Sequence, residues 1–271
     1  MKNFLLVSND HEKIILQKYI DRYAVFSIFV IICYFLTIIT FCCIPVFASK
    51  IFPSEGLYPF PIESPLMMFI IYATQVHTVV QCGLCVGIDF TFAVFFLYAA
   101  ARLEMLCFEI QAAKNERHLN SCIKKHQEII KFVDETKNIV QCCLFITNIV
   151  MAVAAVCGTF PIIYRQSLGT SQFIFVVMSG CLRIYITAWP ADDLMENSER
   201  VSMTVYDMTW VGRSQCIIKN ICFIMQRSQK PLVINIGHLL GILSLKYYAK
   251  YLVTLLSYFT TMRAIIGDLN H

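Results

Sequence analysis

Five long apolar runs constrain this chain more than any other feature of its sequence. They span residues 23–48, 65–101, 139–164, 166–189 and 232–262. A membrane hydrocarbon core of about 30 Å takes roughly 20 residues of helix, so each run is long enough to cross it. Charged residues make up only 15% of the chain, against about 25% in soluble globular proteins. We therefore predict an all-α integral membrane protein with five transmembrane helices.

Two of these runs carry charges that qualify the prediction. The run 65–101 is broken only by Asp89, and as one helix of about 55 Å it must tilt or continue beyond the membrane. Asp89 and His77 are interpreted as packing residues, although a proton or cation role for Asp89 stays open. Lys246 and Lys250 lie within the fifth run, which places its inner part in the cytosol or in a wet vestibule.

The distribution of Lys and Arg predicts the orientation of the chain. Seventeen of the 22 lie before the first run, in residues 102–137 or in residues 183–230, and only Lys50 and Arg165 lie in the other two connections. Basic residues favour the cytosolic side. We predict a cytosolic amino-terminal segment at residues 1–22 and a short extracellular tail at residues 264–271. Helical spacing of apolar residues in 119–137 and 199–227 predicts long helices that pack below the membrane.

Several function classes are excluded or disfavoured. The net charge of +4 forms no basic patch, so no nucleic-acid partner is expected. Most of the 13 cysteines fall in apolar runs, where a free thiol behaves as a small hydrophobe. No nucleophile elbow, phosphate-binding loop or zinc-protease motif occurs, so we predict neither an enzyme nor a cofactor. His118 and His126 lie eight residues apart without an evident third ligand, so no metal site is expected.

The fifth run carries a polar face. Lys250, Thr254, Ser257 and Thr261 are spaced by four, three and four residues and share one side of a helix. Such a face can line water in a pore. It can equally bond carbonyls of its own helix or pack against a neighbouring helix. Spacing alone leaves both interpretations open.

Several short motifs resemble one known family in their order and spacing. Together they resemble the insect odorant receptors, most closely the seven-span receptors of hymenopteran type. The matching stretches are residues 57–60, 103–107, 189–195, 206–210, 225–231 and 257–259. The five runs look like the family's third to seventh spans. The resemblance thus implies that the amino-terminal arm and first two spans of a family member are missing here.

The resemblance also implies a domain organisation. Residues 23–265 would form the receptor's membrane domain. Its cytosolic anchor would comprise residues 102–138 and 190–246, and its pore helix residues 247–263. The expected pore-lining residues are Lys250, Thr254, Ser257, Thr260 and Thr261.

The function that the resemblance implies is an odorant-gated, non-selective cation channel in the plasma membrane of olfactory sensory neurons. The chain would assemble in the bilayer as a hetero-tetramer with a shared co-receptor. A small volatile odorant would bind in a pocket among the outer halves of three spans, where we expect Phe41, Met68, Tyr72, Gln75, Phe173, Val176 and Val177.

The sequence leaves two other functions open. The missing spans raise the alternative of a truncated, non-conducting copy that modulates full-length receptors. Multiple spans and basic inner loops are also compatible with a G-protein-coupled receptor. That class has an external amino terminus, which the distribution of Lys and Arg contradicts.

Overall fold

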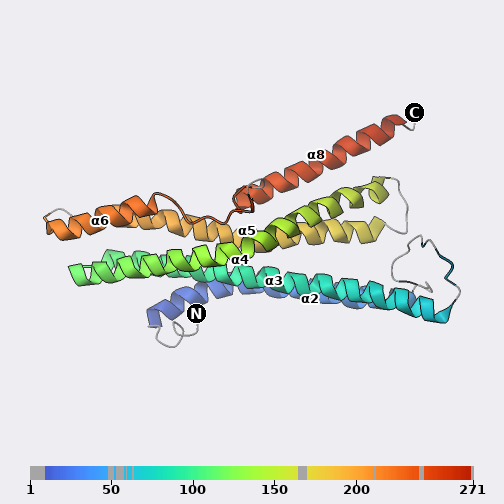
Figure 1. Ribbon diagram of the computed structural model, residues 1–271, viewed down its shortest axis with the longest axis horizontal. Coiled ribbons are helices and arrows are strands. Elements are labelled where there is room, and N and C mark those ends of the chain that lie inside the picture. The colour runs from blue at the N-terminus through green and yellow to red at the C-terminus, as the bar shows by residue number, and fades with distance from the viewer. Residues whose placement is uncertain are drawn as a thin grey trace. The chain divides into compact units, whose positions relative to one another are not determined.

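The computed structural model describes residues 10–47, 52, 58, 60–62, 64–163, 170–209, 212–237 and 241–269. Within these ranges the side chains of residues 10–11, 44–47, 155, 158–163, 170–176 and 266–269 are left undescribed. The described residues form six helices, and the prediction of an all-α chain is confirmed (Figure 1). They are α2 (Asp10–Phe47), α3 (Pro65–Ala112), α4 (Glu116–Ile163), α5 (Thr170–Tyr206), α6 (Gln215–Ser228) and α8 (Leu245–Leu269).

The chain divides into two compact units. The small unit comprises residues 21–91, which supply most of α2 and the first half of α3. The large unit combines the chain up to residue 20 with the chain from residue 92 onward. It therefore holds the beginning of α2, the second half of α3, and α4, α5, α6 and α8.

In the small unit, α2 and α3 run antiparallel. Tyr23 near the start of that part of α2 lies against Phe90 of α3, with ring centroids 6.5 Å apart. At the other end, the hydroxyl of Tyr72 donates to the carbonyl of Cys42 at 3.1 Å. Between them, a Cβ at Gly83 would lie 2.9 Å from Ile38 Cδ1, so the glycine permits close approach of the two helices.

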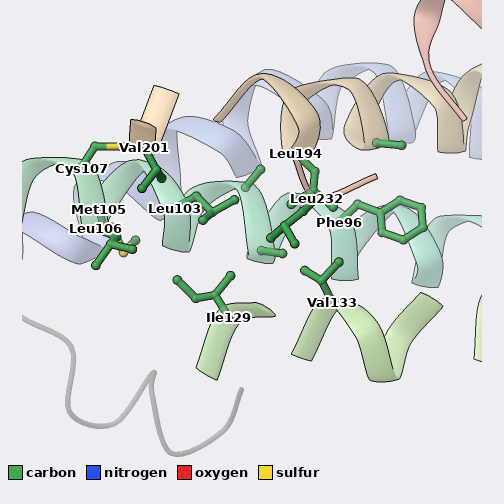
Figure 2. Close-up of a cluster of buried hydrophobic side chains, with 14 of the residues drawn as sticks. Phe96, Leu103, Met105, Leu106, Cys107, Ile129, Val133, Leu194, Val201 and Leu232 are labelled. Carbon is green, nitrogen blue, oxygen red and sulfur yellow. The ribbon is translucent and has the colours of Figure 1, made fainter. Parts of the chain in front are cut away.

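The large unit holds an extensive hydrophobic core. Helix α4 packs against α5, α6 and α8, and α5 also packs against α6 and α8. Side chains from α3, α4, α5 and the segment after α6 meet in this core (Figure 2). Its labelled members include Phe96, Leu103, Ile129, Leu194 and Leu232. Burying each such side chain contributes roughly 1.5–3 kcal/mol to folding. All of these residues except Phe96 belong to the parts predicted to pack below the membrane.

Several helices are long enough to cross a membrane. By length and composition, three segments among the described residues qualify: Glu12–Cys43, Pro65–Ala112 and Glu116–Ala154. Helix α3 continues to Ala112, past the end of the apolar run at residue 101. Helix α4 is one helix of 48 residues that joins the third apolar run to the helical stretch 119–137. The number of five spans and the orientation of the termini stay predictions.

The fourth predicted span is longer than expected. Helix α5 runs from Thr170 to Tyr206 and contains Pro190 in its interior. The helical pattern predicted over 199–227 is therefore split. Residues 207–214 connect α5 to α6, and Gly212 in this connection adopts a φ of 80°.

The predicted helix 232–262 is wrong in its first part, because α8 begins only at Leu245. Leu232, Ile234 and Ile236 are buried in alternation, as in a strand, and Asn235 pairs with Ile242 in an isolated antiparallel bridge. The amide of Ile236 donates to the Gly241 carbonyl at 2.8 Å. Gly241 takes a φ of 86°, which lies outside the right-handed helical region. An apolar run of this length does not by itself distinguish helix from extended chain.

Candidate functional site

The polar side chains of α8 lie at the surface of the described chain. Lys250, Thr254, Ser257, Thr260 and Thr261 are all solvent-exposed in the described chain. Thr254 Oγ1 donates to the Lys250 carbonyl at 2.9 Å, and Thr261 Oγ1 donates to the Ser257 carbonyl at 2.8 Å. Thr260 Oγ1 also donates to the Ser257 carbonyl, at 2.9 Å. The threonine hydroxyl protons are thus used within the helix, which leaves oxygen lone pairs as the outward polar groups.

The amino-terminal end of α8 is held by hydrogen bonds to the rest of the large unit. The Leu245 amide donates to Asp192 Oδ1 of α5 at 3.2 Å, and the Tyr247 amide donates to Ser244 Oγ at 3.2 Å. These bonds satisfy amides that a helix amino terminus leaves without intrahelical acceptors. The Tyr247 hydroxyl donates to Asn148 Oδ1 of α4 at 3.2 Å. Contacts from α4 and α5 therefore hold the first turn of the helix.

The carboxyl-terminal part of α8 exposes apolar as well as polar side chains. Val253 and Leu256 are 66% and 65% exposed, and Ile265 is 51% exposed. Exposure of this extent is costly in water, and it suits a helix that meets lipid or other protein chains. The helix thus combines an anchored amino-terminal end, a polar stripe and an apolar surface.

The predicted odorant-pocket residues fall in both units. In the small unit, Phe41, Met68, Tyr72 and Gln75 are half-buried where the end of α2 faces the start of α3. Gln75 Nε2 donates to the Tyr58 hydroxyl at 2.8 Å, one helical turn from the bond between Tyr72 and Cys42. The polar ends of Tyr72 and Gln75 are therefore held in fixed directions.

The remaining pocket residues lie on α5 in the large unit. Val177 is half-buried, whereas the side chains of Phe173 and Val176 lie outside the described residues. Two cavities of about 550 and 410 Å³ lie between α4 and α6. No predicted pocket residue lines either cavity. The odorant pocket as a whole stays a prediction.

A buried polar cluster was missed by reasoning from the sequence. Asn197 Nδ2 of α5 donates to the Tyr19 hydroxyl of α2 at 2.7 Å, and Lys18 Nζ donates to Glu104 Oε1 of α3 at 2.9 Å. The Tyr19 hydroxyl in turn bonds Glu104. Burial alone would raise the pKa of Glu104, but the hydrogen bonds from Tyr19 and Lys18 outweigh it and lower this pKa. The cluster ties α2, α3 and α5 together outside the predicted spans.

One signal for this cluster was present in the sequence. Glu104 interrupts an apolar stretch and lies within one of the motifs that carry the family resemblance. Its partners could not be inferred, because Tyr19 and Asn197 are 178 residues apart.

A separate group of metal-ligand atoms occurs among the described residues. Glu109, His118 and Cys122 lie together where α3 ends and α4 begins. None of them belongs to the polar face of α8 or to the predicted odorant pocket.

Comparison with known proteins identifies the family. Residues 1–254 match the 7tm odorant receptor family. Among curated relatives, odorant receptor Or2 of Anopheles gambiae is 27% identical over 151 residues, which cover 54% of this chain and 39% of the relative. Odorant receptor 10 of Aedes albopictus is 25% identical, with 72% and 55% covered. Odorant receptor 30a of Drosophila melanogaster is also 25% identical, with 83% and 64% covered. The chain therefore spans less than two thirds of the length of each of these three relatives.

A solved structure shows the same fold. The insect olfactory receptor OR5 from Machilis hrabei in complex with eugenol superposes with a TM-score of 0.75 at 16% identity. The match covers 97% of this chain and 73% of the receptor. The chain belongs to the insect odorant receptor family, a family of membrane receptors for olfaction rather than of enzymes.

Proposed function

We propose that the chain is a subunit of an odorant-gated, non-selective cation channel, assembled with a shared co-receptor in the plasma membrane of olfactory neurons. The observation that supports this most is the exposed polar face of α8, formed by Lys250, Thr254, Ser257, Thr260 and Thr261. A single copy of this helix face cannot enclose a water-filled path. Several copies around an axis would enclose a water-filled path.

The arrangement of α8 suits a gated pathway. Its inner end is held by Asp192, Ser244 and Asn148, while its outer part exposes Val253 and Leu256. A helix that is fixed at one end can change its inclination at the other with little disturbance of the core. The threonine oxygens that point outward can replace water around a passing cation.

The proposed ligand is a small volatile odorant. A solved relative of the same fold is described in complex with eugenol, an odorant of this kind. In this chain Tyr72 and Gln75 would supply orienting polar groups beside Phe41 and Met68. Phe173, Val176 and Val177 of α5 are the other residues proposed to contact the odorant. Apolar walls with few fixed polar groups are typical of such sites.

Co-expression with the co-receptor tests this function. We expect odorant-evoked current from cells that express this chain and the co-receptor, and none from cells that express this chain alone. Whole-cell recording with a panel of volatile odorants, eugenol among them, provides the measurement. Tyr72→Phe removes one hydroxyl and should raise the odorant concentration for half-maximal current by about tenfold, since one hydrogen bond contributes about 1.4 kcal/mol.

The control is surface labelling of the same cells. A chain that reaches the surface with the co-receptor and yields no current to any odorant would contradict the channel proposal. If that chain also lowers the current of a full-length receptor expressed beside it, the modulatory alternative takes its place.

A further inference from the structure

Three side chains with metal-ligating atoms meet at the turn between α3 and α4. Glu109 comes from the last turn of α3, and His118 and Cys122 come from the first turns of α4, one helical turn apart. Their ligand atoms all lie within 4.8 Å of one another. Cys122 is buried, Glu109 is half-buried and His118 is exposed, so the group is closed on one side and open to solvent on the other.

These donors match the preferences of one common cation. Zinc binds thiolate sulfur at about 2.3 Å, imidazole nitrogen at about 2.0–2.1 Å and carboxylate oxygen at about 2.0–2.2 Å, in tetrahedral geometry. Ligand atoms around such an ion lie roughly 3.3–3.7 Å apart. The trio would close on the ion by about 1 Å. A buried thiol and an imidazole also disfavour magnesium and calcium, which prefer oxygen donors.

The charges at the turn also fit. A doubly charged ion with one thiolate, one carboxylate and one neutral imidazole forms a neutral site, which a half-buried position tolerates. Lys125 Nζ now contacts both oxygens of Glu109, at 2.6 and 2.8 Å. One carboxylate oxygen of Glu109 can ligate the ion while the other still accepts the hydrogen bond from Lys125.

Binding requires the loss of one proton. Burial and the Glu109 charge raise the pKa of the Cys122 thiol to about 11, so without metal it stays protonated. Coordination forms the metal–sulfur bond and breaks the S–H bond, and the proton passes to the solvent. No electron is transferred.

We propose that Glu109, His118 and Cys122 form a Zn²⁺ site that clamps the α3–α4 turn, with water at the fourth position. The expectation of no metal site considered only His118 and His126, whereas the fold pairs His118 with different residues. The Arg213 side chain contacts the same turn, because its Nη1 donates to the carbonyls of Ala113 and Lys114 at 3.1 and 3.2 Å. A clamp here would stiffen the turn against which the α5–α6 connection is held.

Cobalt substitution tests the proposal. The purified full-length chain, stripped with a chelator and kept reduced, is titrated with Co²⁺, which takes zinc sites and reports thiolate ligation by a charge-transfer band in the near ultraviolet. We expect one cobalt per chain and loss of the band when Zn²⁺ is added. Cys122→Ser should abolish the band, and His118→Ala should weaken binding by about tenfold or more. Cys216→Ser is the matched control, because this exposed thiol lies 3.0 Å from Glu116 outside the trio and should leave the band unchanged.

A second readout covers the case in which Cys122→Ser fails to fold. Zinc at about tenfold above its Kd should raise the Tm of the unsubstituted chain by about 3 °C, and His118→Ala, a change at an exposed side chain, should lose this rise. A band that survives Cys122→Ser, or the absence of both band and Tm shift in the unsubstituted chain, would overturn the proposal. Neither readout uses an ion current, so the result is independent of the channel function.

Discussion

Replacing Glu104 with alanine is expected to lower the free energy of unfolding by about 3 kcal/mol, through loss of a buried charged acceptor. The Glu104 side chain is 6% exposed and accepts hydrogen bonds from Lys18 and Tyr19. Without it the buried Tyr19 hydroxyl loses the acceptor for its proton. Thermal unfolding of the detergent-purified protein measures the effect, and about 3 kcal/mol corresponds to a Tm lower by roughly 6–12 °C.

Two further variants separate the charge from the shape of this side chain. Glu104→Gln keeps an acceptor of the same size and should recover more than half of the lost stability. Lys18→Met should cost less than about 1 kcal/mol, because the Lys18 side chain is 63% exposed and water screens its charge. Since the pKa of Glu104 is lowered on folding, its contribution is present at neutral pH and lost as the pH falls through that lowered value. Equal stability of Glu104→Ala and the unsubstituted chain would show that the cluster does not hold the three helices together.

Acidification is expected to destabilise the protein through His126. Burial, aided by the charge of Arg227, lowers the pKa of His126 from 6.5 to about 4. Between pH 6.5 and 4 the unfolded chain binds a proton that the folded chain does not, so stability falls as the pH falls and is fully retained above pH 6.5. The total loss is about 3 kcal/mol, of which about 2 kcal/mol is reached by pH 5.

His126→Leu isolates this effect, because a leucine is accommodated beside Ile123, Ile130 and Ile224 and carries no titratable group. The difference in Tm between pH 7 and pH 5 should shrink by roughly 4–8 °C in this variant. His77→Leu serves as the matched control, because His77 is exposed, lies in the small unit and takes no part in the proposed metal site. Its replacement should leave the difference unchanged. The same pH dependence in His126→Leu and the unsubstituted chain would place the acid-sensitive group elsewhere.

The helices could be predicted from the sequence where their apolar residues follow a regular pattern. The apolar runs and the spacing of Leu119, Ile123, Ile130 and Val133 predicted helices, and α4 carries all four of these residues. The length of the second run predicted one long helix that tilts or continues beyond a membrane, and α3 is one helix of 48 residues. Helical periodicity depends only on residues three or four positions apart, so it can be recognised in the amino-acid sequence alone.

The segment 232–244 could not be assigned in this way. Its apolar residues satisfy either a helix or an extended strand, and the choice is made by contacts from elsewhere in the chain. The Leu232 amide donates to Ser198 Oγ at 2.9 Å, and Gly237 lies so close to Phe145 that a Cβ would come within 2.9 Å of its ring. Within the sequence, the glycines and Pro231 were the residues that argued against a continuous helix here.

Residues that act together from distant positions were the part that sequence reasoning missed. Glu104 and Tyr19 belong to separate helices, and so do Glu109 and Cys122. Their contacts arise from packing, which no local pattern encodes. The polar face of α8 was found because its members share a single helix.

The most direct test of the proposed ion path is modification of a cysteine placed at Thr261. In cells that express the co-receptor and Thr261→Cys, a hydrophilic thiol reagent should reduce the odorant-evoked current by more than half, because the added group narrows the path at an exposed site. Phe259→Cys is the matched control, since Phe259 lies about 160° around α8 from Thr261 and about 100° from Thr260 and should be insensitive. The unsubstituted chain controls for its 13 cysteines. Current that is unchanged after complete modification of Thr261→Cys would contradict a pore lined by this face of α8.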